Sequence, residues 1–156
     1  MTELVRLADT IRRAYEGDAW HGPSLSEVLE GIDAVAAATK RGDAHTIWEL
    51  TLHITSWLDI VRRRLEGEKL DDSNLTITDD WPPAPKQVTE AIWQEAKDAV
   101  GHASHRLMAV VAAFPEQKLD QQVPGKDYSY SVMLHGAAQH ALYHAGQIAM
   151  LKKLSS

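Results

Sequence analysis

Cysteine is absent from the 156 residues of the chain, and only one phenylalanine is present. Without cysteine the protein has no disulfide bond, no thiolate metal ligand and no cysteine nucleophile, so thiol chemistry would need a small thiol from outside. Long apolar runs are also absent. The N-terminal segment "MTELVRLADTIRRAYEGDAW", where a signal peptide would lie, alternates charged and apolar side chains. We therefore expect neither a signal peptide nor a membrane span, and a cytoplasmic protein without a membrane partner.

The chain also lacks an excess of positive charge. Its net charge is -6, and no cluster of lysine and arginine is longer than "RRR" at 62–64. Because binding to a phosphate backbone needs a basic surface, we expect no nucleic-acid partner. Apolar residues make up 44% and charged residues 24%, as in ordinary soluble globular proteins. The length fits a single domain over residues 1–156.

Apolar residues recur at helical spacing in four long segments, and no segment alternates apolar and polar residues as a strand would. The predicted helices cover residues 2–16, 46–66, 87–114 and 131–154. A shorter helical segment begins at Ser24, where "SLSE" has the pattern of a capping box, and Gly31 predicts a kink or two short helices. The sequence therefore predicts an all-α protein, a four-helix bundle with one or two additional short helices.

A long connector, residues 68–85, separates the second and third of these helices. It is polar and then proline-rich, and a few extended residues are expected around 75–78. Connections of this length in a compact domain are usually functional or span the molecule. The connector leaves room for a crossover topology, and the sequence leaves open whether it covers a functional site.

Two histidines lie one turn apart within the apolar stripe of the last helix. His140 and His144 form an i, i+4 pair, which places both rings on one face where they can bind one ion. His53 lies at the edge of the apolar stripe of the helix 46–66, so it can face the pair across the bundle. We predict that His53, His140 and His144 bind one divalent metal ion. The alternative is three core histidines satisfied by hydrogen bonds, since leaving one unsatisfied costs about 1–3 kcal/mol.

The other histidines carry weaker signals. His102 and His105 lie off the apolar stripe of their helix, so we expect them at the surface. His45 precedes a helix start and is expected in a loop. His21 follows Trp20 in a loop and either lines a pocket or covers the end of the bundle.

Three further residues near the predicted ligands have two interpretations each. Glu49 either completes a capping box with Thr46 or also forms a hydrogen bond with His53. Trp57 and Tyr143 either line the metal site or belong to the packed core.

The segments that contain the predicted ligands resemble a known family. "AHTIWELTLHI", "HGAAQHALYHAGQI" and, nearer the start, "AWHGPSLSEVLEGI" are similar to the DinB/YfiT-like superfamily of metal-dependent proteins, and the resemblance covers residues 20–151. It implies a four-helix bundle with a crossed connection and a divalent metal held by His53, His140 and His144. Dimers are common among relatives, which implies a homodimer. Some relatives are transferases that use bacillithiol, mycothiol or glutathione, and the family name refers to damage-inducible expression.

Three functions are compatible with such a site. Three neutral ligands leave an ion its full charge and at least one open position, which is the arrangement of a catalytic centre, and imidazole ligands suit zinc, nickel or iron. The first hypothesis is a transferase that activates a low-molecular-weight thiol, and the second is a hydrolase that uses metal-bound water. The third is a non-enzymatic metal-binding or stress-response protein. The small-molecule substrate is unknown. No basic residue is expected near the ligands, although Lys126 or an arginine of a partner subunit could bind an anionic thiol.

Overall fold

The computed structural model describes residues 2–154, so the predicted domain limits, 1 and 156, lie outside the described residues. Within this range the chain is all-α, as predicted, and has no β-strand beyond an isolated bridge between Gln122 and Ser129. The helices are α1 (Glu3–Glu16), α2 (Leu25–Leu29), α3 (Ala34–Ala38), α4 (Ile47–Leu65), α5 (Ile77–Asp80), α6 (Glu90–Ala113) and α7 (Tyr130–Lys153), with a 3-10 turn at Glu116–Lys118. None of the helices in this part of the chain is long and apolar enough to cross a membrane.

Side-chain caps set where the helices begin. The capping boxes predicted at Ser24 and Thr46 both form: in each, the hydroxyl accepts from a backbone N–H and a glutamate three residues later accepts from the cap's own N–H. The segment after Ser24 divides into the two short helices α2 and α3. Gly31, between them, adopts a left-handed conformation with φ 70°, which glycine accepts readily.

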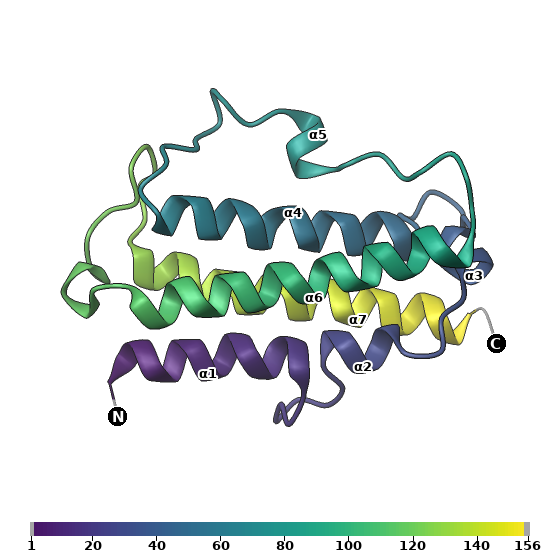
Figure 1. Cartoon of the computed structure of the whole chain (residues 1–156), viewed down its shortest axis with the longest axis horizontal. Helices are drawn as coiled ribbons and strands as arrows, with labels where there is room; N and C mark the ends of the chain where they lie inside the picture. The colour runs from purple at the N-terminus through teal and green to yellow at the C-terminus, as the bar shows by residue number, and fades with distance from the viewer. Residues whose placement is uncertain (1, 155–156) are drawn as a thin grey trace.

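The four long helices form a bundle in which α4 and α1 each pack against both α6 and α7. Figure 1 shows that α4 and α6 run in the same direction, whereas α1 and α7 run in the opposite one. Since two parallel neighbouring helices cannot be joined by a short loop, the connector must return along the whole length of the bundle, as Figure 1 shows. The predicted crossover is therefore confirmed.

The connector contains the helical turn α5, where a few extended residues were expected. Thr76 caps this turn, and Asp79 completes a third capping box that the sequence analysis did not identify. The turn is fixed on α4 by hydrogen bonds: the Ser56 hydroxyl donates to the Asp79 carbonyl, and Trp57 Nε1–H donates to Asp80 Oδ1 at 2.7 Å. The connector thus lies on the face of α4 that carries Trp57.

Two tryptophans form the centre of the core between α4 and α6. Trp48 and Trp93 are 1% and 0% exposed, and their rings are 5.1 Å apart. Trp93 also donates its Nε1–H to the carbonyl oxygen of Ile32 at 2.7 Å, which joins α6 to the turn between α2 and α3. The buried indole N–H of Trp93 thereby satisfies the carbonyl oxygen of Ile32, which lies between two helices.

The substitution Trp93→Phe tests this connection. It keeps an aromatic ring in the core but leaves the Ile32 carbonyl without its donor, which should lower the free energy of unfolding by about 1–3 kcal/mol. Urea unfolding followed by circular dichroism measures the change. Trp20→Phe is the matched control, because Trp20 is fully exposed and its replacement should change stability by less than about 0.5 kcal/mol. Equal effects in both variants would contradict the role assigned to Trp93.

Candidate metal centre

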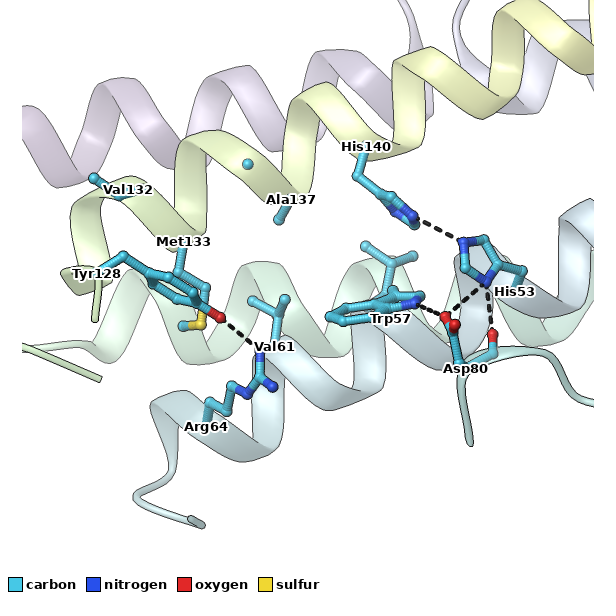
Figure 2. A pocket seen from close by; sticks show the side chains of 12 residues that line it. His53, Trp57, Val61, Arg64, Asp80, Tyr128, Val132, Met133, Ala137 and His140 are labelled. Carbon is cyan, nitrogen blue, oxygen red and sulfur yellow. Dashed lines mark hydrogen bonds and ion pairs between the residues drawn. The ribbon is translucent and has the colours of Figure 1, made fainter. Parts of the chain in front are cut away.

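Three imidazole rings from two helices meet between α4 and α7. Nε2 of His140 lies 3.0 Å from Nε2 of His53 and 3.1 Å from Nε2 of His144. Ligand atoms of all three side chains lie within 4.8 Å of one another. His53 comes from α4, and the other two come from successive turns of α7; His53 and His144 are buried, and His140 is half-buried. The structure thus brings together the three histidines that the sequence predicted, and Figure 2 shows His53 and His140 pointing toward one another.

The tautomer of His53 is fixed by the connector. Its Nδ1 lies 2.6 Å from the backbone carbonyl oxygen of Asp80. A carbonyl oxygen can only accept a hydrogen bond, so Nδ1 must carry the proton. The lone pair of His53 therefore resides on Nε2, the atom that faces the other two rings.

The tautomer of His144 is fixed in the same way. Its Nδ1 lies 2.5 Å from the side-chain oxygen of Gln147, which also accepts, so Nε2 of His144 carries a lone pair. His140 lies between these two acceptors, and a single proton on its Nε2 can be donated well to only one of them. At least one contact of about 3 Å therefore has no proton directed between its two nitrogens. A divalent cation would satisfy all three nitrogens together, so the residues present fit a metal ion.

Burial keeps the three imidazoles neutral. It is the largest cause of the lowered pKa of His53, His140 and His144, and the pKa of His140 is lowered to about 4. The neighbouring imidazoles lower the pKa of His53 and His140 further, because like charges at this distance repel. Near neutral pH the cluster therefore offers unprotonated nitrogens, the form in which histidine binds metals.

The connector covers one side of the cluster with an aromatic ring. The indole of Trp81 stacks on the His53 ring at 3.8 Å between centroids and on the His45 ring at 3.7 Å, with an angle of 9° between the planes in both pairs. His45 lies in the loop before α4, as expected, but its contact with Trp81 was not foreseen. The question left open by the sequence is thus answered: the connector does cover the cluster.

The Asp80 side chain lies on the outer side of His53. Its Oδ1 accepts from Trp57 and is 3.4 Å from His53 Nδ1, the nitrogen that faces away from the cluster. The carboxylate therefore supports the orientation of His53 and is not among the atoms that converge. Asp80 and Trp81 were missed in the sequence because they lie in a connector with no helical periodicity; the length of that connector was the available signal.

A cavity of about 360 Å³ opens beside the cluster. His53, His140 and Asp80 line one end of it, and Arg64 and Tyr128 line it as well. Figure 2 shows the arginine and tyrosine at the end away from the histidines. The walls between are mainly apolar and include Trp57, Val61, Met133 and Ala137.

The cavity is lined by a basic residue that the sequence did not single out. Arg64 is 1% exposed and lines the same cavity as His53 and His140. It lies seven positions after Trp57, which places both side chains on one face of α4. Lys126, the basic residue considered instead, forms an ion pair with Asp72 at 2.5 Å and does not line the cavity.

The structure decides between the two interpretations given for each of Glu49, Trp57 and Tyr143. Glu49 completes the capping box with Thr46 and forms no hydrogen bond with His53 in the described part of the chain. Trp57 lines the cavity. Tyr143 is 66% exposed and does not line it, although its ring contacts the edge of His144.

The remaining histidines lie outside the cluster. His102 and His105 are exposed on α6, as predicted, and His135 is exposed on α7. His21 is exposed in the loop between α1 and α2 and does not line the cavity.

The fold and the cluster define a class of protein: a crossed four-helix bundle with three converging histidines on two of its helices. Comparison with known families agrees with the resemblance seen in the sequence. The chain belongs to the DinB superfamily, whose sequence model matches residues 18–148. No curated protein and no solved structure gives a significant match.

The low pKa of His140 predicts how the stability of the metal-free protein depends on pH. Histidine in an unfolded chain titrates near pH 6.5, whereas the pKa of His140 in the fold is about 4. Between these values the unfolded chain binds more protons, so the free energy of unfolding falls as the pH is lowered. We expect His140 to contribute a loss of about 2 kcal/mol, allowing for its partial exposure.

Urea unfolding of chelator-treated protein at several pH values between neutrality and about pH 4 measures this loss. His140→Gln should remove much of the pH dependence, because glutamine does not titrate. His135→Gln, at an exposed position of the same helix, should leave it unchanged. An identical pH dependence in the two variants would show that His140 does not titrate as its burial requires.

Proposed function

We propose that this protein is a metal-dependent enzyme with a mononuclear centre formed by His53, His140 and His144. The supporting observation concerns two of the three rings. The tautomers of His53 and His144 are fixed by acceptors outside the cluster, so hydrogen bonds within the cluster cannot satisfy all three Nε2 atoms. The donor set suits zinc, nickel or iron. The DinB family match over most of the chain is consistent with this centre.

Catalysis is favoured over metal storage by the surroundings of the cluster. An ion held by three neutral imidazoles keeps its full charge and an open position, so it can lower the pKa of a thiol or of water bound there. A cavity of about 360 Å³ with apolar walls adjoins the cluster and can hold a small organic molecule. A protein that only stores metal would not need such a cavity.

The preferred reaction is transfer of a low-molecular-weight thiol to an electrophilic substrate. The chain has no cysteine, so the sulfur nucleophile must come from a second small molecule. In this proposal Asp80 and Gln147 hold His53 and His144 in the ligand tautomer, while the indoles of Trp57 and Trp81 exclude water from the cluster. A thiolate is more nucleophilic in a site from which water is excluded.

The alternative reaction is hydrolysis. The Asp80 carboxylate lines the cavity beside the cluster, where it could accept a proton from water. This carboxylate already accepts a hydrogen bond from Trp57 and lies on the outer side of His53, which makes the thiol transferase the better-supported choice.

The proposal also includes a cytoplasmic homodimer with a role in the stress response. These features are taken from the sequence and from the resemblance to the family. Three exposed apolar side chains of α7, those of Val132, Tyr143 and Met150, repeat at helical spacing and support a contact between subunits. Light scattering of the purified protein measures its mass in solution.

Metal content is the first test of the centre. Protein purified without an affinity tag should contain about one divalent ion per chain by plasma mass spectrometry. His53→Ala, His140→Ala and His144→Ala should each lose it and remain helical by circular dichroism, because alanine favours helix and the core is otherwise intact. His102→Ala is the control, since His102 is exposed and does not belong to the cluster. A cluster variant that keeps its metal, or a control that loses it, would contradict the proposed ligands.

The open position is tested with a cobalt-substituted protein. Addition of 2-mercaptoethanol near neutral pH should produce the intense near-ultraviolet absorption of a thiolate bound to cobalt, because the ion lowers the pKa of the thiol. Ethylene glycol, which has no sulfur, is the matched control and should produce none. If the thiol also has no effect, the centre does not activate thiols and the transferase is the wrong choice.

A further inference from the structure

A buried arginine lies in the cavity at the end away from the histidine cluster. Arg64 donates from Nε to the Leu70 carbonyl at 2.9 Å and from Nη1 to the Tyr128 hydroxyl at 3.0 Å. Its third nitrogen, Nη2, is buried and has no hydrogen-bond partner. No carboxylate within residues 2–154 pairs with this guanidinium. Figure 2 shows Trp57 and Val61 between Arg64 and the two histidines that line the cavity.

The positive charge of Arg64 is therefore only partly compensated. A guanidinium does not lose its proton in proteins, so burial cannot neutralise it as it does the histidines. The ring of Trp57, with its centroid 5.7 Å from the guanidinium carbon, provides some stabilisation. A buried charge without an opposite charge beside it is nevertheless unfavourable, and an anion that entered the cavity would provide that opposite charge.

The donors at this end of the cavity suit a carboxylate. The Tyr128 hydroxyl accepts from Arg64, so its own proton remains available for donation. Nη2 is buried in the structure, so an entering anion would have to displace the packing around it to gain a second donor beside the one positive charge. A carboxylate has two acceptor oxygens and one negative charge, whereas a phosphate dianion would leave one charge uncompensated in an apolar site.

We propose that Arg64 and Tyr128 form a carboxylate-binding subsite, and that the cavity takes an elongated monocarboxylate with an apolar body. The body would lie against Trp57, Val61 and Met133. His53 and Arg64 are eleven residues apart on one helix, about 16 Å along its axis, so such a molecule can reach from one end to the other. That the far end of the molecule reacts at the histidine cluster rests on the proposed function; the carboxylate subsite itself does not.

Calorimetric titration of the chelator-treated, metal-free protein tests the subsite. Without metal, a carboxylate cannot bind to an ion at the histidines. Octanoate should bind about tenfold tighter than octan-1-ol, which has the same apolar chain but no charge, and tighter than octyl phosphate. Equal affinities for octanoate and octan-1-ol would overturn the subsite, and tighter binding of octyl phosphate would overturn its assignment to a carboxylate.

Two variants assign the preference to named side chains. Arg64→Met keeps an unbranched side chain without charge, and should bind octanoate and octan-1-ol with equal affinity. Arg63→Met is the matched control: Arg63 lies on the same helix, pairs with Glu68 at 2.5 Å and does not line the cavity, so the preference should be unchanged. A preference for octanoate that survives in Arg64→Met would refute the proposal.

Tyr128→Phe keeps the proposal testable if Arg64→Met does not fold. It removes one donor and should reduce the preference for octanoate about threefold; an unchanged preference would remove Tyr128 from the subsite. The content of divalent metal in Arg64→Met should equal that of the wild type, because the hydrogen bonds of Arg64 go to Leu70 and Tyr128 and not to the three histidines. If the carboxylate preference is lost and the metal is retained, the result concerns the subsite alone. Absence of any divalent metal from the wild type concerns the proposed function.

Discussion

The hydrogen bonds on the outer side of His53 and His144 determine the chemistry of the cluster. The Asp80 carbonyl and the Gln147 side-chain oxygen can only accept, so both rings direct unprotonated nitrogens toward His140. Burial lowers the pKa of each ring, so protonation does not relieve the contact at neutral pH. A cation can satisfy three such nitrogens at once, and the proposed function follows from that requirement.

The crossed topology supplies the parts of the site that the two histidine-bearing helices, α4 and α7, lack. Because α4 and α6 are parallel neighbours, the connector must pass back along the bundle, and it crosses the face of α4 that carries His53. The turn α5 then provides the acceptor for His53, and Trp81 follows it directly to stack on the same ring. The connection that closes the fold thus also orients His53 and covers its ring with Trp81.

Helical periodicity and capping patterns sufficed to predict the long helices, because both depend on residues close together in the chain. The convergence of His53 with the pair on α7 was also predictable, since all three interrupt or border apolar stripes. Asp80 and Trp81 were not, because their roles depend on where an aperiodic connector crosses the bundle. Arg64 was missed for a different reason. Its position on the inner face of α4 was readable from its spacing to Trp57, but burial of an unpaired arginine contradicts the usual preference of that residue.

X-ray absorption spectroscopy of the metal-loaded protein tests the central claim most directly, because it reports the ligands of the ion itself. The cluster predicts three imidazole nitrogens at about 2.0–2.1 Å from a bound zinc ion, with at least one further light-atom ligand at the open position. The same spectrum recorded with a small thiol should contain a sulfur ligand at about 2.3 Å. A spectrum with fewer than three imidazoles, or one dominated by carboxylate oxygens, would show that the ion binds elsewhere and that His53, His140 and His144 do not form its site.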